Sequence, residues 1–395
     1  MKFLVLGSGR QGQAIAFDLL RNPSVSTVVL ADSSPESLAS ARKLLGPRRL
    51  KTAHLDASDL VRVRKLAAGS EVFISAAPYF FNLGLARAAI AAKTHFVDLG
   101  GNTGIVRKEL ALHEQAKKAG VTLIPDEGLG PGLTTTLAAH GIEQFEEVRE
   151  VLIRDGGLPQ DPVPPMNYLL TFSEEGLINE YAEKATALRE GRRVEVDGLS
   201  EIETLEIPPL GRLEAAHAAG GLSTLAWTYE GRIRSMDCKL IRYPGHCSAM
   251  AALKAMGFFS PRKIGIGGLR LSPREMTARL FRESFHRPGE KDLVVIRVTV
   301  RGLREGRRAE AVYTLLDRYD EKNRMTAMTR TTGFPASIVA QMLAEGRISK
   351  PGAYPVETGV PARPFLEELK KRGFNLSWSL RYLEPVKTPQ ASCCP

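Results

Sequence analysis

Two short polar segments in the second half of the chain carry side chains that could hold a small charged molecule. They are LEAAHAAGGLSTL, residues 213–225, and IRYPGH, residues 241–246. A guanidinium can hold a carboxylate through two parallel hydrogen bonds, and glycines let a ligand approach the backbone. We therefore predict that these segments clamp the head group of an amino acid. The predicted contacts are Gly221, Ser223, Thr224, Arg242 and His246, with a buried structural histidine as the alternative for His246.

Acidic residues in the first half of the chain could move protons. Asp98 lies in the segment HFVDLG, and Asp126 and Glu127 end the segment VTLIPDE. A carboxylate beside a bound substrate can accept a proton and return it. We predict Glu127 and Asp98 as candidate bases, with His217 of the first polar segment as the next candidate. The alternative is a structural role, which is a turn or helix cap for an acid and a hydrogen-bonded core position for the histidine.

A glycine-rich loop near the start of the chain must be positioned by a strand and a helix. The chain opens KFLVLGSGRQGQAIAFDLL, and the next strand-like run, TVVLAD, ends in Asp32. In this context G-x-G-x-x-G binds the pyrophosphate of a dinucleotide at the helix N-terminus, with a nucleotide-free fold of the same kind as the alternative. Asp32 favours NAD over NADP because it would repel a 2′-phosphate, whereas Arg10 could meet one. The predicted cofactor contacts here are Gly7, Gly9, Arg10, Gln11, Gly12 and Asp32.

Strand-like and helix-like segments alternate through the first part of the chain. The strand-like runs TAHLD, VFISAA, HFVDLG and VTLIPD are each followed by a helical pattern. Such alternation predicts a doubly wound parallel sheet of the Rossmann type, in which ligands lie beyond the carboxyl ends of the strands. We therefore place Asp56 near the adenine and Ala76, Ala77 and Pro78 along the nicotinamide half of the cofactor. Tyr79 could cap the substrate pocket, or it could simply pack at a domain junction.

The second half of the chain has a different pattern. Runs such as VVIRVTVRGLREGRRAEAVYTLLDRYDEKNRMTAMTR read as strands joined by turns, which predicts an α+β domain with a mostly antiparallel sheet. We place the NAD-binding domain at 1–127 and the substrate domain at 128–330. A helix near 331–350 is expected to rejoin the first domain, and 374–395 is expected to be a C-terminal tail.

Composition narrows the class of protein. A chain of 395 residues is expected to form two domains, and no apolar run is long enough to cross a membrane. The net charge of +10 comes from scattered arginines without interleaved aromatic residues, so we do not expect a nucleic-acid partner. The four cysteines have neither metal-ligand nor disulfide spacing, and no signal peptide is apparent. These features favour a metal-free protein of the cytoplasm that acts on a small molecule.

The later motifs resemble a known family. FVDLGGNTG, LIPDEGLGPG, GGLSTL, IRYPGH and MTRTTGFPASIVAQML, together with the glycine loop, resemble lysine 6-dehydrogenases within the saccharopine dehydrogenase-like group. The resemblance runs to about residue 373. It implies a Rossmann domain closed by a second domain, a homodimer or higher homo-oligomer, and NAD as the cofactor. It also implies oxidation of the ε-carbon of L-lysine, with release of ammonia and formation of allysine, which cyclises.

The implied reaction asks for a base, because a protonated amine cannot release hydride and the ε-amine has a reference pKa of about 10.4. Two other functions stay open. Saccharopine dehydrogenase or reductase would act on the same C–N bond but would need further cationic residues for two more carboxylates. A non-catalytic NAD(H)-binding regulator would keep the fold and need no base.

Overall fold

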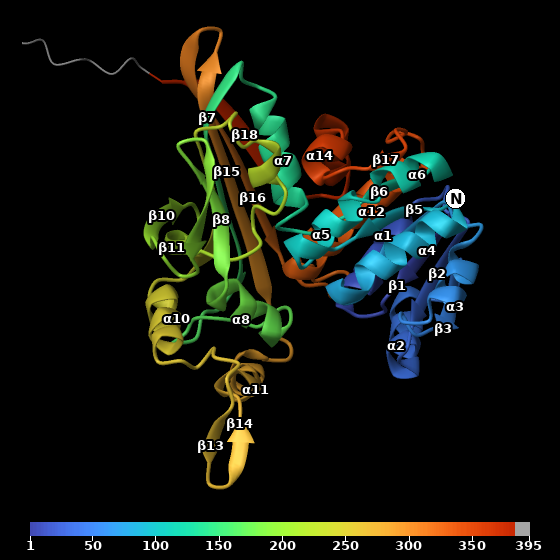
Figure 1. The fold of residues 1–395 in the computed structure, drawn as a ribbon, viewed down its shortest axis with the longest axis horizontal. Coiled ribbons are helices and arrows are strands. Elements are labelled where there is room, and N and C mark those ends of the chain that lie inside the picture. Colours follow the sequence, from blue (N-terminus) through green and yellow to red (C-terminus); the bar gives the residue numbers. More distant parts are fainter. Residues whose placement is uncertain (384–395) are drawn as a thin grey trace, which may run out of the picture.

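The first domain of the computed structural model, which describes residues 1–383, is a parallel sheet covered by helices on both faces (Figure 1). The strand order is β17-β6-β5-β4-β1-β2-β3, and every neighbouring pair is parallel. The central strands are buried on both faces, which explains their unbroken apolar runs. The strands are β1 (Lys2–Leu6), β2 (Thr27–Asp32), β3 (Leu50–His54), β4 (Val72–Ser75), β5 (His95–Asp98), β6 (Thr122–Ile124) and β17 (Gly352–Ala353).

Helices from two distant parts of the sequence cover this sheet. Gly333 allows α12 to lie close to α1, because a Cβ at that position would meet the Cβ of Ala14 at 2.8 Å. The helices before the second domain are α1 (Arg10–Arg21), α2 (Pro35–Leu45), α3 (Leu60–Ala67), the single turn η1 (Tyr79–Phe81), α4 (Asn82–Ala92), α5 (Thr103–Leu110) and α6 (His113–Ala119). The next helix, α7 (Leu133–Ile142), packs against the sheet of the second domain instead. Those after it are α12 (Ala327–Ala344), α13 (Val356–Gly359) and α14 (Ala362–Lys371).

The second domain is built on a nine-stranded sheet. Among the strand pairs described within this sheet, β12 with β7 is parallel and the others are antiparallel. Its main path is β10-β11-β12-β7-β15-β16-β18, and β8 and β9 extend from β12. The fold class predicted from the sequence is therefore confirmed. The strands are β7 (Glu147–Pro159), β8 (Lys184–Arg189), β9 (Arg192–Asp197), β10 (Glu203–Ile207), β11 (Gly211–His217), β12 (Ser235–Arg242), β15 (Asp292–Arg304), β16 (Arg307–Arg318) and β18 (Leu376–Tyr382).

Four helices and a hairpin complete the second domain. They are α8 (Glu174–Ala182), α9 (Leu225–Thr228), α10 (His246–Ala255), α11 (Pro273–Phe285), and the paired strands β13 (Ile264–Ile266) and β14 (Leu269–Leu271). The hairpin projects away from the body of the domain (Figure 1).

The two faces of the large sheet have different surroundings. Asp155 on β7 points toward the segment that joins the two domains, because a Cβ on Gly130 of that segment would lie 2.9 Å from its Oδ2 atom. Side chains alternate along a strand, so the neighbouring Arg154 points to the opposite face. We call the face of Asp155 the inner face and the face of Arg154 the outer face. Cys238 on β12 bonds to Asp155 and Asp237 bonds to Arg154, so β12 follows the same alternation.

Two elements differ from the sequence prediction. The segment MTAMTR was expected to be a strand, but α12 begins inside it at Ala327. The buried carboxylate of Asp292 accepts the amides of Ala327 and Met328, at 2.7 and 2.9 Å, and so caps this helix. The expected tail begins instead with β18, which pairs with β16 from Leu376 to Tyr382. Within residues 1–383, no helix has the length and apolarity needed to span a membrane.

Candidate active site

The glycine loop between β1 and α1 forms a cradle for a dinucleotide. Gly7 has φ of 103°, and a Cβ on Gly12 would lie 1.7 Å from the carbonyl oxygen of Gly7. Gly9 occupies the N-cap position of α1 and has no side chain to bind the first amides of the helix. A Cβ at this position would meet nothing within 4 Å. The first amides of α1 are therefore free to face an anion in open space, which is the arrangement that a pyrophosphate needs.

The other predicted cofactor contacts surround this loop unequally. Asp32 ends β2 and accepts the amides of Ser8, at 2.5 Å, and Ser34, at 2.8 Å, which fixes its carboxylate beside the loop. Gly7 packs against Ala76, which brings the segment of Ala76, Ala77 and Pro78 to the same edge. Arg10 is exposed at the start of α1, and Gln11 is half-buried with its Oε1 atom unpaired.

Asp56, which was placed near the adenine, closes a turn in the structure. Its Oδ1 atom accepts the amide of Ser58 at 2.8 Å and the hydroxyl of the same residue at 2.7 Å. These bonds close a turn and lower the pKa of this exposed carboxyl. A role for Asp56 beside the adenine has no support in these contacts.

Asp98 lies at the end of β5 in a fully buried polar cluster. One of its oxygens, Oδ1, accepts the side-chain amide of Asn82 at 2.9 Å and the backbone amide of Gly100 at 2.7 Å. The carboxyl of Glu109 from α5 lies against it, and the two acids can bond only by sharing a proton. Burial raises the pKa of Asp98 to about 6, and burial together with Asp98 raises the pKa of Glu109 to about 11.

Asp126 and Glu127 follow β6 in the same buried region. Asp126 has φ of 69°, and its Oδ2 atom accepts the hydroxyl of Ser223 from the second domain. Burial raises the pKa of Asp126 to about 7, against the lowering effect of that hydroxyl. Glu127 is fully buried with both oxygens unpaired, and burial followed by the charge of Asp126 raises its pKa well above the usual range. Of the two acids after β6, Asp126 is therefore the one with a pKa close to neutrality.

The first polar segment lies at the junction of the two domains. The hydroxyl of Ser223 donates to Asp126, and the hydroxyl of Thr224 donates to Glu357 of α13 at 2.9 Å. Gly221 packs on Cys238, since a Cβ there would lie 2.4 Å from the sulfur. Tyr79 lies on the other side of the junction, partly exposed and against Gly101 of the loop after β5. The segment thus joins the inner face of the large sheet to the strand ends of the first domain.

Arg242 is buried on the inner face at the end of β12. Its Nε atom donates to the hydroxyl of Tyr181 at 2.8 Å, and its Nη1 atom donates to the carbonyl of Ile241. The guanidinium lies over the rings of Tyr168 and Tyr181, at 5.2 and 5.7 Å from their centroids. Its Nη2 atom is 3.5 Å from the carboxylate of Glu180. The Nη2 protons have no hydrogen-bond acceptor within the described residues and are available to a ligand.

His246 supports Arg242 rather than facing the crevice, which is the space between the strand ends of the first domain and the inner face of the large sheet. The hydroxyl of Tyr181 accepts from Arg242 and so donates to His246 Nε2, at 2.9 Å. The other ring nitrogen, Nδ1, donates to the carbonyl of Met166 at 3.0 Å. Burial, followed by the charge of Arg242, lowers the pKa of His246 to about 3, so the ring is neutral. Both ring nitrogens have protein partners, which favours the structural alternative given for His246 over a direct substrate contact.

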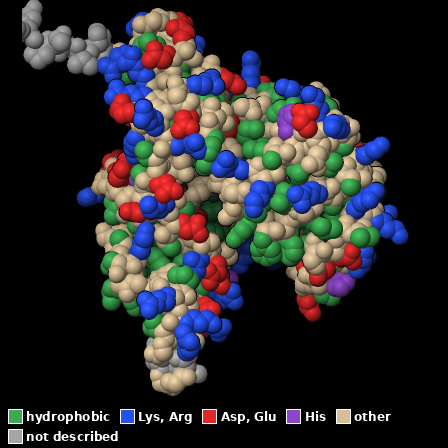
Figure 2. Space-filling model, viewed as in Figure 1, with side chains coloured by type: hydrophobic (Ala, Val, Ile, Leu, Met, Phe, Trp, Pro, Cys, Tyr) green, Lys and Arg blue, Asp and Glu red, His purple; other side chains and the backbone are tan. Residues whose placement is uncertain are grey.

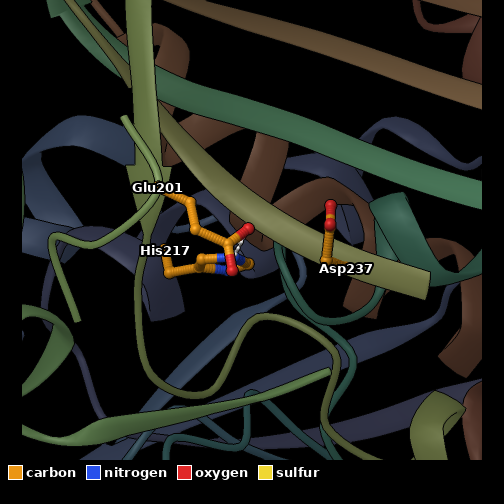
Figure 3. Close-up of side chains that lie close together, drawn as sticks. All are labelled: Glu201, His217 and Asp237. Atoms are coloured by element: carbon orange, nitrogen blue, oxygen red, sulfur yellow. Dashed lines mark hydrogen bonds and ion pairs between the residues drawn. The ribbon is translucent and has the colours of Figure 1, made fainter. Parts of the chain in front are cut away.

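His217 lies on the outer face of the sheet, away from the acids of the crevice. It pairs with Lys239 across β11 and β12, and its Nε2 atom donates to Glu201 at 3.1 Å. Figure 3 shows this contact, with Asp237 on the adjacent strand. These three residues have the spacing of a metal site, but Arg154 and Arg189 bind Asp237 and Lys239 binds the carbonyl of Glu201. The prediction of His217 as a base in the crevice is not supported by this position.

Comparisons with known proteins agree with this architecture. Residues 3–124 match the model of the saccharopine dehydrogenase NADP-binding domain, and residues 128–374 match that of the saccharopine dehydrogenase C-terminal domain. The chain belongs to the saccharopine dehydrogenase family. The first domain is therefore a pyridine nucleotide-binding domain, and membership of this family supports the prediction of an oxidoreductase.

Individual relatives are distant. The chain is 24% identical over 445 residues to the α-aminoadipic semialdehyde synthase of Bos taurus, covering 94% of this chain and 47% of that protein. It is 28% identical over 195 residues to the saccharopine dehydrogenase [NADP(+), L-glutamate-forming] of Saccharomyces cerevisiae, covering 48% of this chain and 42% of that one. The chain thus spans about half the length of these relatives, or less. An apo saccharopine dehydrogenase (L-Glu forming) structure from the same yeast has a TM-score of 0.80 at 20% identity, over 96% of this chain and 99% of that one, which shows a shared fold.

Several residues of the crevice in this saccharopine dehydrogenase family member were not singled out from the sequence. Asp126 was set below Glu127, and the partners contributed by helices were missed altogether. A helical acid such as Glu180 or Glu109 gives no local signal, because the same residue type covers most solvated helix faces. The residues missed are Glu109, Asp155, Glu180, Tyr181 and Glu357.

Proposed function

We propose that the protein is a pyridine nucleotide-dependent oxidoreductase that acts on the carbon–nitrogen bond at the side-chain nitrogen of lysine or of a lysine derivative. Saccharopine is the first candidate substrate, because the family models that match the two domains are those of saccharopine dehydrogenase and one of the relatives named above is a saccharopine dehydrogenase. L-lysine, with the nitrogen unsubstituted, is the second candidate.

The observation that carries this proposal is the position of Asp126. Its carboxyl lies beyond the end of β6, on the edge of the parallel sheet that also carries the glycine loop, and bonds to Ser223 of the segment that packs on the inner face of the large sheet. A buried acid with a pKa of about 7 at the junction of the two domains has the position and the proton affinity of a general base.

The residues of the crevice have separate tasks. A bound nicotinamide would accept the hydride from the carbon that carries the nitrogen. Asp126 would take the proton from the reacting amine, since only the neutral amine can support hydride loss. After releasing that proton to solvent, the ionised carboxylate could stabilise the positive charge of the imine and accept a proton from the water that hydrolyses it. Arg242 would hold a carboxylate at the far end of the substrate and so fix the reacting carbon.

A count of the charged groups favours lysine, the second candidate, over saccharopine. Saccharopine carries two more carboxylates than lysine does, and each needs a cationic or amide partner. Among the described residues, Arg242 is the one guanidinium placed on the inner face beside Asp155 and Glu180. Arg154 and Arg189 lie with Asp237 on the outer face instead.

NAD is the proposed cofactor, on the evidence of Asp32. Its fixed carboxylate would accept the ribose hydroxyls and repel a 2′-phosphate. The exposed Arg10 beside the loop is the feature that would favour NADP instead.

A direct assay tests the proposal. Purified protein is supplied with L-saccharopine or L-lysine and with NAD or NADP, and the absorbance of the reduced nicotinamide is followed at alkaline pH. Reduction that depends on saccharopine, with glutamate as a product, supports the first candidate. Reduction that depends on lysine, with release of ammonia, supports the second. If neither amine is oxidised with either cofactor, the proposed function is wrong.

A further inference from the structure

Glu180 and Arg242 form a pair of opposite charges whose hydrogen-bonding capacity is not used up. Their closest atoms, Glu180 Oε2 and Arg242 Nη2, are 3.5 Å apart, and no hydrogen bond joins the two side chains. Glu180 Oε2 is shielded from solvent without a partner, although it belongs to a carboxylate that favours charged donors. A buried charge left in this state costs free energy that a ligand can recover.

Glu180 is the more exposed member of the pair. The side chain of Arg242 is 3% exposed, whereas that of Glu180 is 26% exposed, so the acid lies toward the open space. The space-filling view shows a notch between the two domains (Figure 2). The backbone of Glu180 accepts the amide of Ala219 at 2.9 Å, which ties the end of α8 to the glycines of the first polar segment. Gly220 has open space where a Cβ would lie, so a ligand can approach the backbone there.

The surroundings hold both groups in place. Arg242 is fixed by Tyr181, which is fixed in turn by His246, and the three residues form one hydrogen-bonded chain. Burial and the nearby Asp155 raise the pKa of Glu180 to about 7, against the opposing effect of Arg242. Two carboxyls thus surround one guanidinium, and the cluster lacks a positive charge. An ammonium group would supply it.

We propose that Glu180 and Arg242 together bind the α-amino-acid head group of the substrate, Glu180 taking the α-ammonium and Arg242 the α-carboxylate. An α-amino acid carries these two charges on adjacent atoms, and the protein presents their partners side by side. The site therefore selects ligands with a free α-amino group next to a free carboxylate, which both lysine and saccharopine have. A diamine or an Nα-acylated amino acid lacks one half of this pattern. This inference rests on the proposed function for the identity of the substrate.

Calorimetric binding to the full-length protein loaded with NADH tests the inference without needing turnover. The ligands are L-lysine, 6-aminohexanoate, which lacks the α-ammonium, and cadaverine, which lacks the α-carboxylate. L-saccharopine and its Nα-acetylated form at the lysine end are titrated in parallel. We expect L-lysine or L-saccharopine to bind at least about tenfold more tightly than its analogue without the free α-ammonium, because one charged hydrogen bond is lost.

The variant Glu180→Gln should remove this difference. It should weaken binding of the complete ligand about tenfold or more, leave 6-aminohexanoate within about twofold, and so reduce the discrimination to near unity. Glu175→Gln is the matched control, because Glu175 lies on the same helix but pairs with Arg274 at the surface. Its ligand discrimination should equal that of the unaltered protein.

Three results would overturn the inference. They are equal loss of affinity for all ligands in Glu180→Gln, unchanged discrimination in that variant, and failure of the unaltered protein to distinguish L-lysine or L-saccharopine from its analogue. The last comparison needs no variant and stands even if Glu180→Gln does not fold. If the expected binding pattern appears but no amine is oxidised, the head-group site is supported and the proposed function is wrong.

Discussion

The hydroxyl of Ser223 in the second domain donates a hydrogen bond to the carboxylate of Asp126 at the strand ends of the first domain. This bond favours the ionised form of Asp126, whereas burial of the carboxyl favours the protonated form. The balance sets the pKa of the proposed base, and the residue that tunes it comes from the other domain.

Replacing Ser223 by alanine should therefore shift the pH profile of the reaction. Loss of the donor raises the pKa of Asp126, so the acid limb of kcat/KM in the oxidative direction should move to higher pH by about 0.5–1 unit. Initial rates from pH 5 to pH 10 measure the shift. Ser377→Ala, on the exposed strand β18, is the control and should leave the profile in place. An unshifted acid limb in Ser223→Ala would remove Asp126 as the titrating group.

The acid pair of Glu109 and Asp98 predicts how stability depends on pH. The pKa of Glu109 is raised to about 11 in the folded protein from 4.5, chiefly by burial and then by Asp98. Its contribution to stability is complete below pH 4.5 and is lost as the pH rises toward the folded-state value, because the unfolded chain releases a proton that the folded chain retains. Stability should fall by up to roughly 1 kcal/mol per pH unit in that window.

Glu109→Gln removes this loss while keeping a donor for Asp98. The variant should gain stability relative to the unaltered protein as the pH rises from 5 to 9, measured by urea denaturation at each pH. Glu114→Gln, at an exposed position on α6, should show no such trend. A difference that stays constant with pH would mean that the folded protein does not retain the proton on Glu109.

Local sequence signals predicted the first domain better than the second. The glycine loop, Asp32 and the alternation of strands are encoded within short stretches, so the fold class could be predicted from them. His217 illustrates what could not be read. In LEAAH, apolar residues lie on both faces of the strand, so the sequence does not indicate which face is the inner one. The pairing of His217 with Lys239 on the outer face is a matter of register between strands, which the sequence of either strand leaves open.

The prediction of the head-group site was incomplete for a similar reason. Arg242 was chosen from residue type, but Glu180 and Tyr181 reach it from α8, some 60 positions earlier in the chain. The strand at the start of the expected tail was missed because LSWSL has a weak strand pattern and acquires its structure by pairing with β16, where Trp378 stacks on Tyr313. Residues 384–395 of that tail lie outside the described residues.

Cofactor preference should depend on Asp32. Asp32→Ser removes the carboxylate that would repel a 2′-phosphate, so the ratio of kcat/KM for NADP over NAD should rise about tenfold or more. The ratio is measured with saturating amine substrate. Asp56→Asn is the control, because Asp56 closes an exposed turn with Ser58, and it should leave the ratio unchanged. A ratio that stays constant in Asp32→Ser would indicate that the ribose hydroxyls are bound elsewhere.

The outer-face position of His217 makes a prediction that separates stability from catalysis. His217→Gln removes the hydrogen bond to Glu201 within a cluster that also holds Asp237, Arg154 and Lys239. The free energy of unfolding should fall by about 1 kcal/mol, because a charged hydrogen bond is lost. Because the side chain points away from Asp126 and Arg242, kcat and KM should stay within about twofold of the unaltered values at all pH values tested. A fall in kcat of tenfold or more, with the pH profile altered, would return His217 to the list of candidate bases. It would mean that a change on the outer face of the sheet affects catalysis on the inner face.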